Sequence, residues 1–288
     1  MILGIFNVND GSLICELNKD PVMKVKELAS DSNEECDAIF LNWIKTEHDK
    51  KNSNKGKLIL KQTELVEEFT RTKKPIIIFD SQASMTEKEY SWLKKFNVVF
   101  FEPYLNHRRG FRYLPFWLKI KTLNDIQFCN WKRTPLGYKG SISDRIQAFD
   151  KYYVSEMYGG LEVNYDADIR HENNYVDFSV KKKPIEFCDL KATILINTFN
   201  QNMCGYLHSD FVKALENNCI PLIPIENRYY NAFESIVEND FSVWYNVKSY
   251  DLCYVGIIHQ IYVDIKNYYP EMDVVYTANL IKNYLSDM

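Results

Sequence analysis

The segment CGYLHSDFVKALENNCIPLIPI, residues 204–225, places polar side chains where a short helix should begin. Gly205 allows a tight turn, and His208 or Ser209 can cap the helix. Backbone N–H groups at a helix start carry partial positive charge and suit a phosphate, although an ordinary capped helix is the alternative. Asp210 in the first turn would repel an anion, so it either binds a hydroxyl-rich group or stabilises the helix dipole.

Three acids follow apolar runs in the first half of the chain and are candidates for a general base. Asp80 ends PIIIFD, Asp10 lies in NVNDGS, and Glu102 lies in FFEP. A carboxylate at the carboxyl end of a strand can remove a proton from an attacking hydroxyl group. Asp80 ranks first, Asp10 second and Glu102 third, with capping of the following helix as the alternative role for each.

The stretch NHRRGFRYLPFWLKIK, residues 106–121, mixes cations with aromatic side chains. Cations contact phosphates and aromatic rings stack on bases, as a DNA-binding loop requires. The formal net charge is -4, yet residues 103–143 hold eight basic residues and one acid. A basic surface loop over a buried aromatic cluster is the alternative. The candidate DNA-binding residues are Arg108, Arg109, Arg112 and Lys119.

Short apolar runs alternate with helical patterns in the first half, which predicts a parallel sheet covered on both faces. The expected strands are 3–8, 37–44, 75–80 and 98–103, and the expected helices are 21–29, 61–72 and 86–96. The Lys/Asn-rich segment 45–57 is expected to form a mobile surface loop.

The pattern loosens over 104–132 and then begins again. We expect strands at 134–140, 161–166, 192–199 and 241–246, and helices at 143–157, 249–268 and 273–286. Two successive α/β patterns predict two Rossmann-like domains facing a central cleft, which binds ligands at the carboxyl ends of the strands. The expected domains are residues 1–130 and 131–270, with a final helix in 271–288 that packs back on the first domain.

Composition indicates a globular protein of 288 residues with 46% hydrophobic and 26% charged residues. The seven cysteines are scattered and form no CxxC pair, which favours buried thiols in a reducing compartment. We expect a cytoplasmic monomer with no membrane partner and no tightly bound cofactor or metal. The chain has no GxGxxG or P-loop lysine motif, which disfavours a dehydrogenase and a P-loop kinase.

Two motifs resemble the donor domain of nucleotide-sugar glycosyltransferases with the two-Rossmann GT-B architecture. GYLHSDFVKALENNCIPLIP resembles the donor-site segment, and its run ALENNCIPLI is similar to a fucosyltransferase-like pattern. LGYKGSISDRIQAFDKYY, residues 136–153, resembles the strand, glycine turn and Arg-bearing helix that open that domain in phage and bacterial transferases. The resemblance covers the second half only.

The resemblance implies that a sugar nucleotide lies between the two motifs, with Arg145 bridging phosphate oxygens. A surface arginine paired with Asp144 or Asp150 is the alternative for Arg145. The usual Glu or Lys near the helix start is replaced by Ser209 and Asp210, and Glu216 could reach a ribose or sugar hydroxyl. The implied donor-site residues are Gly140, Ser141, Arg145, Tyr206, His208, Ser209, Asp210 and Glu216.

The basic stretch and the Lys/Asn/Tyr-rich composition are similar to DNA-modifying sugar transferases of T-even-like bacteriophages. That resemblance implies a UDP-sugar donor, UDP-glucose or UDP-arabinose, and double-stranded DNA with 5-hydroxymethylcytosine, or its glycosylated form, as acceptor. The modified base would be flipped into the cleft. Two alternatives stay open: the same transfer to a cell-surface glycan or lipopolysaccharide, and a non-catalytic nucleotide- or DNA-binding protein.

Overall fold

The computed structural model divides the chain into two compact units. The first unit contains Met1–Trp117 and Glu271–Met288, and the second contains Leu118–Pro270. By this division residues 118–130 belong with the second unit. The structure describes residues 1–8, 10–28, 35–45, 54–126, 134–139, 162–164, 186–195, 204–207, 209–222 and 251–287.

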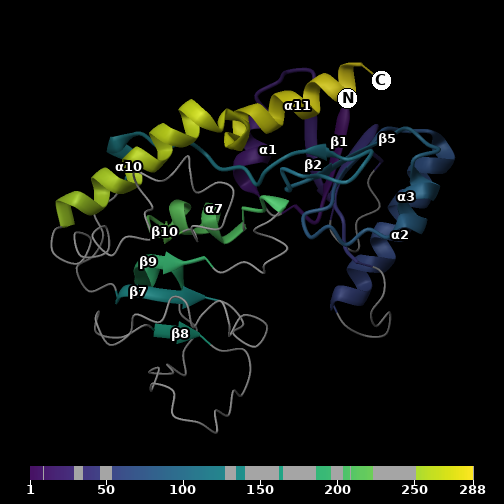
Figure 1. Cartoon of the computed structure of the whole chain (residues 1–288). Helices are drawn as coiled ribbons and strands as arrows, with labels where there is room; N and C mark the ends of the chain where they lie inside the picture. The colour runs from purple at the N-terminus through teal and green to yellow at the C-terminus, as the bar shows by residue number, and fades with distance from the viewer. Residues whose placement is uncertain are drawn as a thin grey trace, which may run out of the picture. The chain divides into compact units, whose positions relative to one another are not determined.

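The first unit is built on a sheet whose six strands are all parallel (Figure 1). Its spatial order is β2-β1-β3-β4-β5-β6. The chain therefore builds outward from β1 to β2 and then crosses to the other side of β1, so the strand order reverses between β1 and β3. The strands are β1 (Ile2–Phe6), β2 (Lys24–Leu28), β3 (Ala38–Asn42), β4 (Ile76–Phe79), β5 (Val98–Glu102) and β6 (Arg112–Tyr113).

Each face of this sheet is covered by helices, because its central strands are apolar on both sides. One face packs with α1 (Gly11–Leu17) and α11 (Val274–Ser286), through residues such as Leu13, Phe40 and Ile281. The other face packs with α2 (Asn54–Thr72) and α3 (Glu87–Leu93), through residues such as Leu65 and Leu93. The last helix of the chain thus belongs to the core of the first unit.

The second unit contains a smaller parallel sheet with the order β10-β9-β7-β8. Here the strand order reverses between β7 and β9. Its strands are β7 (Thr134–Lys139), β8 (Glu162–Asn164), β9 (Leu190–Ile194) and β10 (Ile220–Leu222). Its helices among the described residues are η1 (Leu123–Asp125), η2 (Phe187–Asp189), α7 (Ser209–Glu216) and α10 (Asp251–Tyr268), and η3 (Pro270–Met272) leads into α11. The predicted α/β class, with a parallel sheet in each half of the chain, is confirmed.

The start of the first unit differs from the sequence-based prediction. Residues 24–28, which lie in the expected helix 21–29, form edge strand β2, because their backbone pairs with β1 over all five residues. Pairing with the sheet here overrides the helix propensity of Lys, Glu and Leu. The helix is instead α1, whose buried Leu13 and Leu17 are four residues apart and whose N-cap is Asp10.

Gly110 is a position where the fold requires glycine. Its φ is +90°, and a Cβ built there would lie 1.8 Å from the hydroxyl oxygen of Tyr90. The Tyr90 ring is held against Phe100 and Phe111, with centroid distances of 5.0 and 5.3 Å, so it has little freedom to move aside.

We expect Gly110→Ala to lower the free energy of unfolding by about 2–3 kcal/mol, from backbone strain and overpacking. Urea unfolding followed by circular dichroism measures this change. Adding Tyr90→Phe should restore part of the loss, because it removes the closest atom. Gly11→Ala is the control, since no atom lies within 4 Å of its Cβ position. Equal midpoints for wild type and Gly110→Ala would contradict the steric requirement for glycine at this position.

Candidate active site

The donor motifs predicted from sequence are attached to the two strands at the reversal point of the second sheet. Lys139 ends β7 at the carboxyl edge of the sheet, and Gly140 is the next residue in the sequence. Neighbouring β9 ends at Ile194, and the chain after it leads to α7. In open α/β sheets the carboxyl edge at such a reversal is where ligands bind. Gly140, Ser141, Arg145 and His208 themselves lie outside the described residues.

Helix α7 is held in place by packing along its buried face. Phe211, Ala214 and Leu215 are fully buried, and the hydroxyl group of buried Tyr262 donates to the Leu215 carbonyl oxygen at 3.1 Å. Burial raises the pKa of Tyr262, so this hydroxyl stays protonated as a donor. The helix start therefore has a defined direction relative to its sheet.

Around this helix start, the predicted residues differ in environment. Ser209 and Asp210 are partly buried, and Tyr206 is buried. The Asp210 carboxylate pairs with Lys213 Nζ at 3.3 Å one turn along the helix. This exposed cation offsets part of the charge with which Asp210 would repel an anion, and Asp210 also suits the helix dipole.

Glu216 lies at the opposite end of α7, about 10 Å along the helix axis from Ser209 at 1.5 Å per residue. Its side chain is exposed. The structure thus does not bring Glu216 together with Ser209 and Asp210. This end of α7 is closed by Lys121, whose Nζ donates to the Glu216 carbonyl oxygen at 2.7 Å and to Asn218 Oδ1 at 3.1 Å. Burial lowers the pKa of Lys121, which caps the helix and is no longer a free member of the basic stretch.

Thr193 is a candidate ligand-binding residue that the sequence did not indicate. It lies on β9 opposite Gly137 of β7, its side chain is 1% exposed, and its hydroxyl group has no hydrogen-bond partner among the described residues. A buried hydroxyl group without a partner is uncommon and marks a place where a ligand or water would be stabilised. No local sequence signal marks this residue, because TILINT looks like any buried strand.

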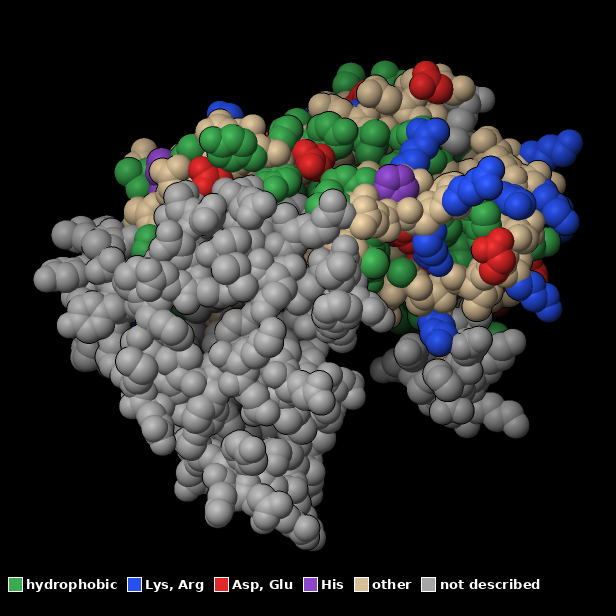
Figure 2. Space-filling model, in the orientation of Figure 1, with side chains coloured by type: hydrophobic (Ala, Val, Ile, Leu, Met, Phe, Trp, Pro, Cys, Tyr) green, Lys and Arg blue, Asp and Glu red, His purple; other side chains and the backbone are tan. Residues whose placement is uncertain are grey.

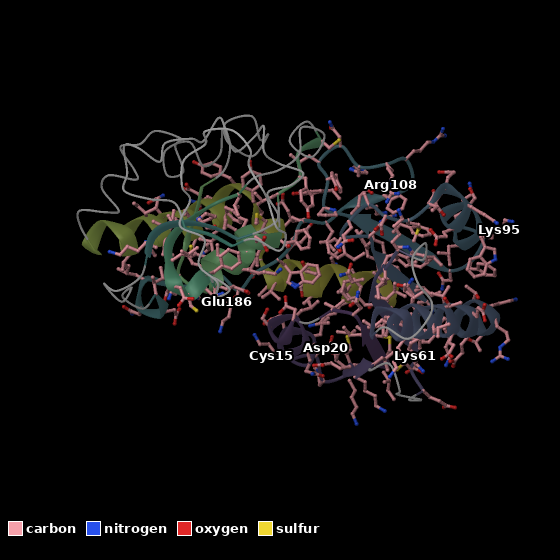
Figure 3. All side chains as sticks on the ribbon, turned by 90° about the horizontal axis from the view of Figure 1, so that it is seen from below. Cys15, Asp20, Lys61, Lys95, Arg108 and Glu186 are labelled. Carbon is pink, nitrogen blue, oxygen red and sulfur yellow. The ribbon has the colours of Figure 1, made fainter. Side chains whose placement is uncertain are left out.

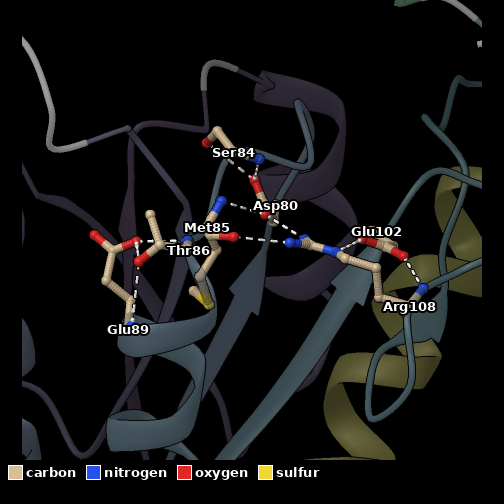
Figure 4. A network of polar contacts seen from close by, with 7 residues as sticks. All are labelled: Asp80, Ser84, Met85, Thr86, Glu89, Glu102 and Arg108. Atoms are coloured by element: carbon tan, nitrogen blue, oxygen red, sulfur yellow. Dashed lines mark hydrogen bonds and ion pairs between the residues drawn. The ribbon is translucent and has the colours of Figure 1, made fainter. Parts of the chain in front are cut away.

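In the first unit, Asp80 is the centre of a polar network and has no exposed surface (Figure 4). Its Oδ1 accepts hydrogen bonds from Ser84 N at 2.8 Å and Ser84 Oγ at 3.2 Å. Its Oδ2 accepts from Met85 N at 2.8 Å and from Arg108 Nη2 at 2.6 Å. Both oxygens are engaged, so Asp80 in this conformation is an anchor for the chain that follows β4.

Arg108 joins this network to Glu102, which is 1% exposed at the end of the neighbouring strand β5. Its Nε donates to Glu102 Oε2 at 2.7 Å, its backbone N–H donates to Glu102 Oε1, and its Nη1 donates to the Met85 carbonyl oxygen at 2.8 Å. The guanidinium carbon also lies 4.1 Å from the Phe111 ring centroid. Partial burial lowers the pKa of Arg108, but the hydrogen bonds to Asp80 and Glu102 more than offset this and raise it overall. Arg108 therefore fastens its loop to the sheet.

Asp10 has a different environment, at the edge where β1 and β3 meet. As N-cap of α1 its Oδ1 accepts hydrogen bonds from Ser12 N, Ser12 Oγ and Leu13 N, at 2.9, 2.5 and 3.2 Å. Its Oδ2 accepts none from the described part of the chain, and the residue is partly buried. Asp10 is thus both a helix cap and a carboxylate with one available oxygen.

Asn7 and Asn42 lie at the same edge as Asp10, just after β1 and at the end of β3. Asn7 has a left-handed φ of 54°, and its Nδ2 donates to the Asn42 carbonyl oxygen at 3.1 Å. The Oδ1 of Asn42 is buried without a partner in the described ranges. At this edge Asp10 keeps one carboxylate oxygen without a described hydrogen bond, whereas both oxygens of Asp80 are engaged.

The predicted DNA-binding residues separate into two groups. Arg109, Arg112 and Lys119 are exposed, and the Arg112 guanidinium lies 4.8 Å from the Tyr284 ring centroid. Arg108 is engaged in the network described above. The aromatic side chains of this stretch pack mainly inward: Phe111 and Trp117 are buried, and Phe116 packs edge-on against Phe79. A basic loop over an aromatic cluster describes it better than a stacking surface.

The described residues contain neither a metal cluster nor a bilayer-spanning helix. Over these ranges, no three His, Cys, Asp or Glu side chains come together as a metal site would require. None of the described helices is both long and apolar enough to span a bilayer.

Comparison with known proteins finds a likeness in structure but none in sequence. No protein-family model matches the sequence, and no curated protein matches it. A solved structure described as "Crystal Structure of alpha1,3-Fucosyltransferase" aligns over 99% of this chain and 90% of its own, with 10% sequence identity and a TM-score of 0.48. At this level the likeness does not by itself assign an activity to the chain.

Substitution of Asp80 and of Asp10 distinguishes the structural roles of these two carboxylates. Asp80→Asn should lower the free energy of unfolding by about 2–4 kcal/mol, because it weakens the charge pair with partly exposed Arg108. Asp10→Asn should cost at most about 1 kcal/mol, since asparagine is also a good N-cap. Chemical denaturation measures both values. A smaller loss for Asp80→Asn than for Asp10→Asn would contradict the anchoring role of Asp80.

Proposed function

We propose that the chain is a glycosyltransferase that uses a nucleotide sugar as donor. The observation that carries the proposal is the strand order of the second sheet. It makes the ends of β7 and β9 neighbours at one reversal point, and in the sequence the two motifs lie at and after these strand ends. Motif position and strand topology are independent, and both indicate the same edge as a binding site.

The donor is a UDP-sugar in this proposal, UDP-glucose or UDP-arabinose. The backbone N–H groups at the start of α7 bind the diphosphate, together with Gly140, Ser141 and Arg145. Ser209 and Asp210 form the start of this helix, and His208 precedes them in the sequence. In this proposal Asp210 binds a donor hydroxyl, and buried Tyr206 supports the turn before the helix. Lys213 is already paired with Asp210. The positive charge that stabilises the leaving diphosphate therefore comes chiefly from Arg145 and the helix dipole.

The base in this proposal is Asp10, which takes the acceptor's hydroxyl proton on its available oxygen. Formation of the new bond to the anomeric carbon then releases the nucleoside diphosphate. The acceptor to test first is DNA that contains 5-hydroxymethylcytosine, bare or glycosylated, because exposed Arg109, Arg112 and Lys119 can contact its phosphates. Asp80 keeps an indirect role, since it anchors Arg108 and hence the loop that carries Arg109.

A cell-surface glycan or lipopolysaccharide is the second candidate acceptor, and one observation favours it. Arg108, one of the four predicted DNA-binding cations, is bound to Asp80 and Glu102, and the aromatic side chains Phe111 and Trp117 of the same stretch are buried inside the fold. A glycan acceptor needs no basic loop. The two acceptors therefore differ in their dependence on salt and on the exposed arginines.

Mass spectrometry after incubation with a panel of UDP-sugars tests the function. Hydroxymethylcytosine DNA, the same DNA already glucosylated, and lipopolysaccharide serve as acceptors. The proposal expects the mass of one sugar to be added to DNA, and release of UDP. A chain that neither transfers sugar to any acceptor nor hydrolyses any UDP-sugar is not a glycosyltransferase of this kind.

Substitution of the exposed cations distinguishes the acceptors. Arg109→Ala, Arg112→Ala and Lys119→Ala together should raise the KM for DNA and reduce the salt dependence of kcat/KM, with a change of slope up to about 3. Slow hydrolysis of the UDP-sugar without acceptor should stay within about twofold. Lys266→Ala, an exposed lysine on α10, is the control. Unchanged DNA kinetics in the triple variant would exclude this loop as the DNA contact.

A further inference from the structure

A second basic surface lies at the other end of the first sheet, where β4 and β5 begin. The segments 71–75 and 92–97 precede these two strands and contain five basic residues and no acid. They are neighbours in space, because β4 and β5 pair in parallel and Ile76 N donates to the Asn97 carbonyl oxygen at 2.9 Å. The name "amino-edge surface" is used here for Arg71, Lys73, Trp92, Lys94, Lys95 and Phe96.

The cations of the amino-edge surface point to solvent. Arg71, Lys73, Lys94 and Lys95 are all exposed, and none forms an ion pair with another described residue. Lys94 lies 5.3 Å from the Tyr90 ring centroid, which orients it without neutralising it. Lys74 beside them is half-buried and donates to the Cys36 carbonyl oxygen. Figure 2 shows Lys and Arg side chains gathered on the side of the molecule where α2 and α3 lie.

Two aromatic side chains lie among these cations. Trp92 and Phe96 are 41% and 37% exposed, and their rings meet edge to face with centroids 5.5 Å apart. Their exposure is not required by the core, since buried Leu93 supplies the packing of α3. An exposed tryptophan costs hydration free energy, which a partner with flat apolar faces would recover.

The amino-edge surface is separate from the loop of Arg108. The two lie at opposite ends of β4 and β5. The five residues of β5, at about 3.3 Å each, separate these ends by roughly 16 Å. Figure 3 shows Lys95 at the outer margin of the first unit, away from Arg108. The lysines here also lie at the C-terminal ends of α2 and α3, where they suit the helix dipoles, but that role explains neither exposed aromatic ring.

We propose that the amino-edge surface binds single-stranded nucleic acid. Lysine and arginine side chains contact the phosphates, and Trp92 and Phe96 offer rings on which unpaired bases stack. Charge complementarity favours a polyanion, because the segments 71–75 and 92–97 carry four exposed cations and no acid. Stacked base pairs in a duplex hide their faces, so the exposed rings favour a single strand over a double one. This surface needs no sugar transfer, so it stands or falls separately from the proposed function.

Fluorescence anisotropy with a labelled oligothymidylate of about 15 nucleotides tests the proposal, without any nucleotide sugar. The Arg109→Ala/Arg112→Ala protein is used beside the wild type, so that the loop of Arg108 does not contribute. Trp92→Ala should weaken binding about 5- to 160-fold, which corresponds to the loss of one stacked base. Lys73→Ala with Lys95→Ala should reduce the slope of log K against log salt by about 1.4.

The control combines Lys266→Ala with Tyr268→Ala, an exposed cation and an exposed aromatic on α10, and should bind as the parent does. Thermal unfolding of each variant should match its parent, because the altered side chains are exposed. Binding that is equal in all variants would overturn the proposal. So would binding to vesicles of phosphatidylglycerol and phosphatidylcholine that requires Trp92 while the oligonucleotide does not bind, since that would assign the surface to anionic lipid.

Discussion

Parallel pairing of the strands is the constraint on which the rest of this structure depends. All strands of a parallel sheet end at one edge, so residues far apart in sequence come together wherever two strand ends are neighbours. In each unit the chain builds outward from its first strand and then crosses to the other side of it. The resulting reversals, at β1/β3 and β7/β9, put Asn7 beside Asn42 in one unit and the end of β7 beside the end of β9 in the other.

The carboxyl edge of the first sheet is further ordered by one arginine. Arg108 ties the ends of β4 and β5 together through two buried carboxylates, and its hydrogen bond to Met85 holds the loop that leads to α3. A buried charge network of this kind is costly to break, so it fixes the loops on which it acts. The exposed Arg109 and Arg112 therefore project from a rigid support, which suits recognition of a charged partner.

Much of this fold is readable from the sequence, because buried parallel strands are continuous apolar runs. The strands at 3–8, 37–44, 75–80 and 98–103 are confirmed as β1, β3, β4 and β5, and the helix at 86–96 contains α3 with its capping box of Thr86 and Glu89. The prediction of a helix at edge strand β2 was wrong. Its sequence KVKEL has no long apolar run that would indicate a strand, and only its pairing with β1 makes it one. The Lys/Asn-rich segment 45–57 is partly helical, because α2 begins at Asn54, and residues 46–53 lie outside the described ranges.

The site was less predictable than the fold, because side-chain roles depend on partners far along the chain. Nothing near Asp80 in the sequence indicates that Arg108, 28 residues later, occupies its carboxylate. Hydrogen exchange measured by mass spectrometry, with and without UDP-glucose, most directly tests the proposed binding of a nucleotide sugar at the β7/β9 reversal. A donor site there predicts slower exchange confined to residues near 139–145 and 204–212. Protection in the first unit alone, or none at a saturating concentration, would contradict a donor site at this edge.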